Sequence, residues 1–226
     1  MKQLRYPGYI FCCWLLLLLG ACSRMNDTYY DFIKDGPVTY TGKADSVKAF
    51  AGNGRVMLSW LLTSDQTITG CKVYWNFNAD SMVLPFAKTA GTDTVTVYID
   101  SLREGAYNFT VYTYDAAGHR SVGSEAIGNV YGPVFLSTLS NRPVRSVTWD
   151  TAASTVHVTW VGQDLKCLGT EWQYTGTDHL PRHFFSPMGD TSVIADCDFG
   201  SPVAYRSLFI PEVNAIDTFY TDYKPL

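Results

Sequence analysis

The chain has 226 residues, with 17 lysines and arginines against 21 aspartates and glutamates, and aromatic residues make up 15% of it. The formal net charge of -4 leaves no positive surplus that could displace counterions from phosphates, which excludes a basic nucleic-acid-binding protein. After residue 21 the chain holds 19 valines but only 12 leucines and 4 glutamates. Because β-branched residues favour strands whereas leucine and glutamate favour helices, this composition predicts an all-β protein.

The first 21 residues are predicted to be a lipoprotein signal peptide. Lys2 and Arg5 precede an uncharged stretch at 10–19, which is shorter than the roughly 20 residues that span a bilayer. Residues 19–22 read Leu-Gly-Ala-Cys and resemble the lipobox of bacterial lipoproteins, in which the cysteine is acylated. Several acyl chains on one residue anchor a protein stably, so we expect lipidation at Cys22. The alternative is an ordinary secretory signal that is cut elsewhere.

Cleavage before Cys22 changes the charge of the chain. The loss of Lys2 and Arg5 leaves 15 positive and 21 negative side chains, a net charge of -6. Residues 22–39 are then predicted to form an anchor stalk. Its apolar side chains could lie on one side of a helical turn and dock on the domain that follows: Tyr29, Tyr30, Phe32 and Ile33.

Residues 40–132 are predicted to form a fibronectin-III-like β-sandwich. Segments that alternate apolar and polar residues are separated by turn residues about every ten positions, as in small antiparallel sandwiches. Leu102, Gly105 and Tyr107 resemble the tyrosine corner of fibronectin type III modules, where a phenol hydroxyl ties a strand to an upstream backbone group. The clearest alternating segments are 55–60, 71–75, 94–99 and 107–112.

Residues 141–226 are predicted to form a second sandwich of the same kind, after a connector at 133–140. Trp60 and Tyr107 have counterparts in Trp160 and Tyr205, at offsets of 100 and 98 residues. The connector is apolar, which favours two domains packed together over two domains on a polar tether. Strands are expected near 144–149, 155–161, 170–175, 182–186, 192–197, 203–210 and 217–223.

Three thiols remain beyond the predicted anchor. Alternation places Cys71 and Cys197 in inward rows, whereas Cys167 falls out of phase with Trp172. A buried free thiol is the expectation for Cys71. A bridge between Cys167 and Cys197 stays open, since an odd number of thiols outside the cytoplasm allows one pair at most.

Several segments resemble those of an uncharacterised family of Bacteroidota lipoproteins. They are residues 29–36, 40–47, 54–60, 73–76, 112–115 and 130–132. The resemblance implies a lipid-anchored pair of β-sandwiches in the outer membrane, often followed by a discoidin-like carbohydrate-binding domain and often encoded near glycan-uptake systems. The discoidin-like part is not expected here, because the sequence stops at Leu226. The leaflet, periplasmic or cell-surface, stays open.

No set of residues predicts catalysis. The sequence has no Gly-x-Ser-x-Gly elbow, and its four mature glutamates offer no pair for glycoside hydrolysis. His179 and His183 have the spacing of metal ligands on a helix, but Pro181 opposes that helix. Asp196 and Asp198 form a fragment of a calcium loop without its distal acid. We therefore expect no enzyme, no cofactor and no metal.

The feature best suited to binding is aromatic. If Val73 and Val111 face the core, then Tyr74, Tyr112 and Tyr114 face outward on neighbouring strands. Exposed tyrosine rings offer apolar faces and a polar tip to a ligand such as a sugar. The alternative is that these tyrosines are ordinary surface pairs, or that another part of the chain covers them.

The sequence thus predicts a lipid-anchored, non-catalytic interaction or spacer protein of the outer membrane. The alternative is a glycan-binding accessory lipoprotein of a polysaccharide-uptake system that uses the tyrosine face. Its expected partners are the membrane, through Cys22, and a polysaccharide or surface protein, but not nucleic acid. Short motifs such as Asp80-Ser81-Met82, in an expected loop, also resemble bacterial O-glycosylation sites.

Overall fold

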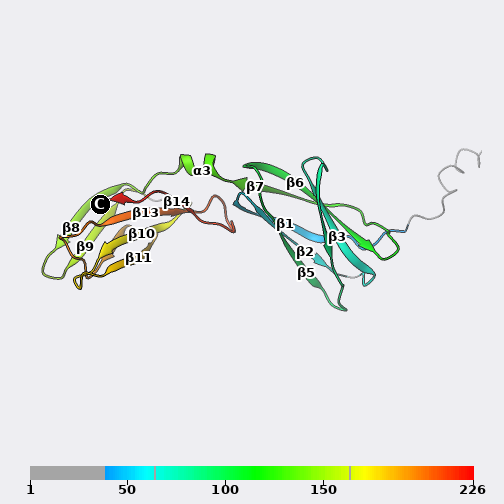
Figure 1. Ribbon diagram of the computed structural model, residues 1–226, viewed down its shortest axis with the longest axis horizontal. Helices are drawn as coiled ribbons and strands as arrows, with labels where there is room; N and C mark the ends of the chain where they lie inside the picture. Colours follow the sequence, from blue (N-terminus) through cyan, green and yellow to red (C-terminus); the bar gives the residue numbers. More distant parts are fainter. Residues whose placement is uncertain (1–38, 64, 163) are drawn as a thin grey trace, which may run out of the picture. The chain divides into compact units, whose positions relative to one another are not determined.

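The computed structural model describes residues 39–63, 65–162 and 164–226 (Figure 1). Nearly all of the regular structure in these residues is β-strand, and α3 (Pro133–Thr138) is the one helix among them. The expected all-β class is confirmed. The predicted signal peptide, Cys22 and stalk residues 22–38 lie outside the described residues.

The first sandwich has two sheets that share strand β1 (Asp45–Asn53). In the first sheet, β1 pairs antiparallel with β2 (Val56–Leu62), which pairs with β5 (Asp93–Ile99). The end of β1 then pairs in parallel with β7 of the second sheet, Gly52 with Val130 and Asn53 with Tyr131. The second sheet has the order β4-β3-β6-β7. Its strands are β3 (Ile68–Trp75), β4 (Asp80–Pro85), β6 (Gly105–Asp115) and β7 (Ser124–Tyr131).

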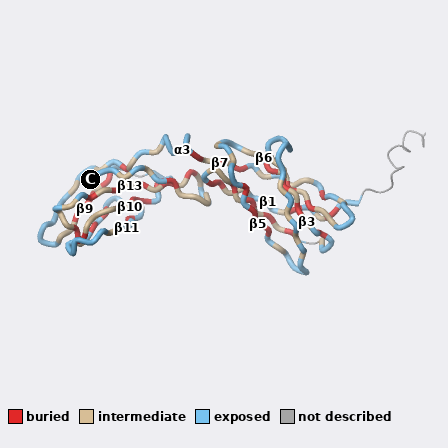
Figure 2. Tube along the Cα trace, viewed as in Figure 1, coloured by how far each residue is buried: buried red, intermediate tan, exposed pale blue. Residues whose placement is uncertain are grey.

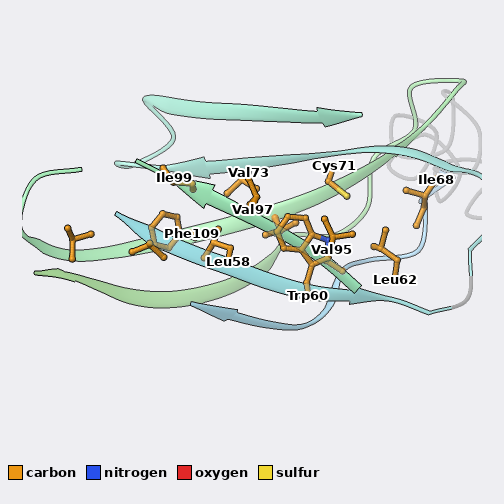
Figure 3. Packing of buried hydrophobic residues seen from close by; sticks show 14 residues of the cluster. Leu58, Trp60, Leu62, Ile68, Cys71, Val73, Val95, Val97, Ile99 and Phe109 are labelled. Carbon is orange, nitrogen blue, oxygen red and sulfur yellow. The ribbon is translucent and has the colours of Figure 1, made fainter. Parts of the chain in front are cut away.

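The first core forms because alternate residues of both sheets point inward. Along β2 every second residue is buried, as a half-buried strand requires. Leu58 and Trp60 of one sheet meet Val73 and Phe109 of the other between the layers (Figure 3). Burying one such side chain stabilises the fold by about 1.5–3 kcal/mol. The predicted inward rows, including Cys71, are confirmed.

The second sandwich has the same two-sheet plan. Its first sheet has the order β12-β9-β8, and its second has the order β11-β10-β13-β14, with β15 also paired to β13. Buried residues lie along the strands of both sandwiches, whereas most turns are exposed (Figure 2). The strands are β8 (Val144–Asp150), β9 (Thr155–Trp160), β10 (Cys167–Thr175), β11 (Pro181–Pro187), β12 (Thr191–Ile194), β13 (Ala204–Phe209), β14 (Phe219–Tyr220) and β15 (Lys224–Pro225).

Two of the expected strands of the second sandwich differ from the observed ones. The strand expected at 192–197 ends at Ile194, because Asp196 has a φ of 55°, which leaves the extended region. Of the strand expected at 217–223 only β14 forms, and β15 lies just beyond that range.

The second core is built around three aromatic residues. The ring centroids of Trp160, Trp172 and Tyr205 lie 5.2 to 5.8 Å apart. Each ring also has a hydrogen-bond partner: Trp160 Nε1 donates to Ser192 Oγ (2.9 Å), Trp172 Nε1 to Thr170 Oγ1 (3.0 Å) and the Tyr205 hydroxyl to the Arg142 carbonyl (2.8 Å).

A pair of buried hydroxyl residues shows how the two sandwiches correspond. Thr113 N donates to Ser121 Oγ at 3.0 Å, and Ser207 N donates to Thr221 Oγ1 at 2.8 Å. The return bonds also match, since Ser121 N reaches the Thr113 carbonyl and Thr221 N the Ser207 carbonyl. Ser207 therefore stands where Thr113 stands, at an offset of 94 residues from 113 to 207. This confirms an internal repeat.

The same register corrects the expected match between Tyr107 and Tyr205. Tyr205 lies opposite Trp172, as Val111 lies opposite Val73, so Tyr205 takes the place of Val111. The Tyr107 hydroxyl donates to the Arg103 carbonyl at 3.1 Å, which is the predicted tyrosine corner. Tyr205 makes no such local bond and ties its strand to Arg142 instead. The expected offset of 98 is wrong for this strand.

The three cysteines in the described part of the chain are free and buried. Cys167 points inward because the pairing of β10 with β13 shifts register between Cys167 and Gly169, where Gly169 has a φ of 152°. This irregularity brings Cys167 into phase with Trp172. The expectation that Cys167 is out of phase is wrong, and Cys167 and Cys197 are not bridged.

The connector forms a short helix that the first sandwich caps. The Glu104 carboxylate accepts hydrogen bonds from the backbone N–H groups of Val134 (2.7 Å) and Phe135 (2.8 Å). These N–H groups would otherwise lack partners at the start of α3. The centroid of the Phe135 ring lies 5.0 Å from those of both Tyr131 and Phe219, whereas Val134 and Leu136 are exposed, so one apolar side chain of the helix packs and two do not.

The segment between β13 and β14 bonds to residues at the end of β1. The Asp217 carboxylate accepts two hydrogen bonds from the Arg55 guanidinium (2.6 and 2.9 Å) and one from Asn53 N (2.8 Å). Ile216 N donates to the Ala51 carbonyl at 2.8 Å. A Cβ atom at Gly52 would lie 2.6 Å from Asp217 Oδ2 and 2.9 Å from the Arg55 carbonyl oxygen, so any other residue would disturb this approach.

Candidate binding face of the first sandwich

The predicted tyrosine face lies on the outer side of the sheet β4-β3-β6-β7. Val73 and Val111 are buried, so the residues that alternate with them, Tyr74 on β3 and Tyr112 and Tyr114 on β6, point away from the core. The structure therefore brings the three predicted residues to one face. All three side chains are half-buried rather than fully exposed.

Two cations lie against these rings. The Lys72 ammonium is 4.7 Å from the centroid of Tyr74, and the Arg120 guanidinium is 4.6 Å from the centroid of Tyr112. The two rings meet edge to face with centroids 5.8 Å apart. Such cation–π contacts contribute about 0.5–1 kcal/mol at exposed sites and occupy a face of each ring.

The pKa values of two of these phenols shift in opposite directions. The Lys72 ammonium lowers the pKa of Tyr74 below the ordinary tyrosine value. Burial raises the pKa of Tyr114, and the neighbouring Tyr74 raises it further. The face therefore offers polar phenol tips and positive charge, with little flat aromatic surface left open.

Gly123 lets the chain pass close to this face. A Cβ atom there would lie 2.8 Å from Thr110 Cγ2 and 3.0 Å from Tyr112 Cζ. A larger residue would thus have to displace the Thr110 methyl group and the Tyr112 ring. Because Gly123 lies this close to the Tyr112 ring, the chain's own backbone covers part of that ring.

The same outer face carries a hollow at its other end. Its volume is about 510 Å³, and its walls come from the β3–β4 turn, from the start of β6 and from Glu125 on β7. None of these residues was predicted from the sequence to form a site. A turn of sequence Asn-Phe-Asn, with an aromatic residue between two asparagines, is the signal that could have drawn attention to it. Besides Glu125, the hollow is lined by Asn76, Phe77, Asn78, Glu104, Gly105, Ala106, Tyr107, Asn108 and Thr110.

His179 and His183 do not lie on one face of a helix. His179 sits in a turn with a φ of 61°, and its Nδ1 lies 3.6 Å from Asp198 Oδ2. His183 lies on strand β11, not on a helix. The Arg182 guanidinium lies between Asp178 (2.9 Å) and Asp196 (2.6 Å), so a protein cation already neutralises Asp196.

Chemical groups elsewhere have structural partners. Glu104 caps α3, Glu171 pairs with Arg206 at 2.6 Å, and Glu212 accepts from Asn129 and Tyr131. Within residues 39–63, 65–162 and 164–226, no group of three or more His, Cys, Asp or Glu side chains could hold a metal ion. Among these residues, no helix has the length and apolarity that crossing a bilayer requires.

The candidate glycosylation motif lies in a different element from the expected one. Asp80, Ser81 and Met82 belong to strand β4, and Ser81 is exposed opposite Tyr74. The expectation of a loop is wrong, because the β3–β4 turn already ends at Ala79.

Comparison with known proteins gives a family and many distant structural likenesses, among them two structures from chicken. A family model, DUF4998, described as a domain of unknown function, matches residues 22–219. No curated protein matches the chain. The FN1-FN3 domains of chicken CNTN1 are 10% identical, with a TM-score of 0.47, over 84% of this chain and 66% of that one. A segment of two fibronectin type III domains from chicken tenascin is 9% identical, with a TM-score of 0.34, over 82% of this chain and 98% of that one.

Proposed function

The chain belongs to the DUF4998 family, a domain of unknown function, and from its own residues we propose that it is a lipid-anchored, non-catalytic interaction or spacer protein of the outer membrane. Family membership confirms the expected kinship with an uncharacterised family. Two fibronectin-III-like sandwiches suit an interaction or spacer role, because such modules present sheet faces and loops on a stable core. The lipid anchor would be Cys22.

The observation that carries the proposal is that the reactive group lies at the predicted anchor, whereas most glutamates of the sandwiches are bonded within the protein and their thiols are buried. The one reactive position that the sequence indicates is Cys22, after a signal-like stretch. In the two sandwiches, three of the four glutamates cap, pair or bond within the protein, and the three described thiols are buried. Burial raises the pKa of the Cys71 thiol to about 11, which keeps it protonated and unreactive at neutral pH.

Intact mass of the native protein extracted from outer membranes tests the anchor. We expect the mass of residues 22–226 plus acyl chains, and we expect Cys22→Ser to shift the protein to the soluble fraction. The same spectrum reads out glycosylation at Ser81, since an added hexose series disappears in Ser81→Ala. A native chain that starts at another residue, or that carries no acyl mass, contradicts the proposal.

A second candidate function is glycan binding as an accessory lipoprotein of a polysaccharide-uptake system. It is favoured by the gathering of Tyr74, Tyr112 and Tyr114 on one outer face. Tyr74→Ala with Tyr112→Ala should abolish retention of the soluble protein on a polysaccharide affinity gel. Tyr98→Ala, which removes a tyrosine that is 47% exposed on β5 of the other sheet, is the matched control. Unchanged retention of the double variant would exclude the tyrosine face as the contact.

A further inference from the structure

The turn between β3 and β4 holds an exposed aromatic ring in an unfavourable backbone conformation. Asn76, Phe77 and Asn78 have φ angles of 51°, 55° and 66°, so three successive residues other than glycine are left-handed. Side chains other than those of Asn, Asp and Gly rarely adopt this region, and phenylalanine gains nothing there. The Phe77 side chain is fully exposed, so core packing does not explain its position.

The protein nevertheless fixes this turn. Ala79 N donates to the Asn76 carbonyl at 3.0 Å, and Asn76 Nδ2 donates to Asp80 Oδ2 at 3.0 Å. Strained backbone positions cluster at functional sites such as ligand contacts, so this turn is a candidate contact position. Phe77 lies at the edge of the hollow of about 510 Å³ described above.

The walls of the hollow offer amide, hydroxyl and carboxylate groups. Asn78, Asn108, Thr110 and Glu125 line it, and their side chains make no hydrogen bond to another residue in the described part of the chain. Glu104 also lines it, but both of its oxygens already accept from α3. The hollow thus has several polar groups that a ligand could use.

The backbone of β6 is also accessible here. β3 pairs with β6 only as far as Tyr74 and Thr110, whereas β6 begins five residues earlier at Gly105. Gly105 and Ala106 are exposed and small, so they leave room above the sheet. A volume of about 510 Å³ is in the range of small-molecule sites, which is about 300–1,000 Å³.

The charge of the walls selects among ligands. The lining residues include Glu104 and Glu125 but no lysine, arginine or histidine. Anionic ligands would therefore meet only negative charge. A neutral saccharide fits all of the groups, because its C–H face packs on an aromatic ring while its hydroxyls pair with amides and a carboxylate.

We propose that this hollow, with Phe77 at its edge and Asn108 and Glu125 in its walls, binds a neutral saccharide unit of a polysaccharide. The proposal rests on the second candidate function, and it moves the principal contact from the tyrosines to the opposite end of the same face. Phe77 stacks on the sugar ring, and Asn108 and Glu125 bind its hydroxyls.

Affinity electrophoresis of the soluble Cys22→Ser chain tests the proposal. The gels contain galactomannan, xyloglucan or arabinoxylan as neutral probes and polygalacturonate or heparin as acidic probes. We expect retardation by at least one neutral probe and by neither acidic one. Phe77→Ala and Asn108→Ala should each weaken binding at least tenfold, and Ala106→Trp should block it by filling the hollow. Phe185→Ala, which removes an exposed phenylalanine of the second sandwich, should bind as the parent does.

A second variant separates binding from folding. Phe77→Gly relieves the left-handed backbone, so it should raise the melting temperature by about 2–4 °C while it abolishes retardation. A lower melting temperature for Phe77→Gly would overturn the view that Phe77 is held for a ligand.

Each of three other results of the electrophoresis would overturn the proposed site. Retardation that is lost only in the Tyr74→Ala, Tyr112→Ala variant overturns this site but leaves the glycan-binding function standing. Retardation by acidic probes alone overturns the charge argument and hence the proposal. No retardation by any probe overturns both the site and the second candidate function, while the anchored spacer remains subject to its own mass measurement.

Discussion

The two sandwiches share a strand order but stabilise their cores by different chemistry. In the first core most of the buried residues are aliphatic, and the buried indole Nε1 of Trp60 has no oxygen or nitrogen partner in the described structure, only the weakly accepting thiol of Cys71 nearby. In the second core, Trp160, Trp172 and Tyr205 pack on one another and each has a hydrogen-bond partner. The topology of a sandwich thus constrains which positions are buried, not which groups fill them.

Removing the central ring of the aromatic core should destabilise the protein most. Trp172 is fully buried between Trp160 and Tyr205, so Trp172→Ala should destabilise the protein by about 3–5 kcal/mol through lost burial and a cavity. Urea unfolding followed by circular dichroism measures the change. Trp149→Ala, at an exposed tryptophan, is the matched control and should cost much less. Equal losses for both variants would refute the central role of Trp172.

Removing the buried hydroxyl of Tyr205 should destabilise the protein more than removing the hydroxyl of Tyr107. Tyr205→Phe leaves the Arg142 carbonyl without its buried partner and should cost about 1–3 kcal/mol. Tyr107→Phe removes a bond in a more exposed setting and should cost about 0.5–1.5 kcal/mol. Thermal unfolding of the two variants side by side gives the difference. A larger loss for Tyr107→Phe would reverse the assignment of the stronger tie.

A matched pair of tryptophan variants isolates one hydrogen bond. Trp60→Phe and Trp160→Phe remove the same atoms from two cores, but only Trp160 loses a bond to an oxygen, Ser192 Oγ, whereas Trp60 faces the weaker acceptor Cys71 Sγ. We expect Trp160→Phe to cost about 0.5–1.5 kcal/mol more than Trp60→Phe. Ser192→Ala should reduce that excess, because it removes the same bond from the other side. If the two phenylalanine variants are equally stable, the bond contributes nothing.

The smallest effect is electrostatic and depends on pH. The Arg55 guanidinium lowers the pKa of Asp217 in the folded protein below the ordinary aspartate value of about 3.9. The contribution of this pair is therefore complete above about pH 5 and is lost as the pH falls through the lowered value. Because both side chains are partly exposed, it should be about 0.2–1 kcal/mol.

Unfolding of Asp217→Asn between pH 2 and pH 7 checks this. The variant should lose stability at pH 7 and show a shallower fall toward acid than the parent. Arg55→Ala combined with Asp217→Asn should be no less stable at pH 7 than the less stable single variant. A parallel pH profile for parent and Asp217→Asn would contradict a coupling to folding.

Much of the fold follows from local patterns in the sequence. Period-2 alternation is enough to identify the buried rows of β2, β3 and β6, because one face of each strand meets the core. The bend at Gly169 and the four-residue displacement of Tyr205 could not be predicted this way, since they arise from register between strands distant in sequence. The hollow beside Phe77 has the same origin, because it depends on where β3 stops against β6.

The parallel pairing of Gly52 and Asn53 with Val130 and Tyr131 has a mechanical consequence. Since β1 and β7 run in the same direction there, the chain enters the first sandwich at one end of these strands and leaves it at the other. A pull applied between a membrane tether and a bound partner would load their backbone hydrogen bonds sideways and together, rather than one after another. A protein that works as a spacer would thus meet tension in the direction in which a β-ladder resists it best.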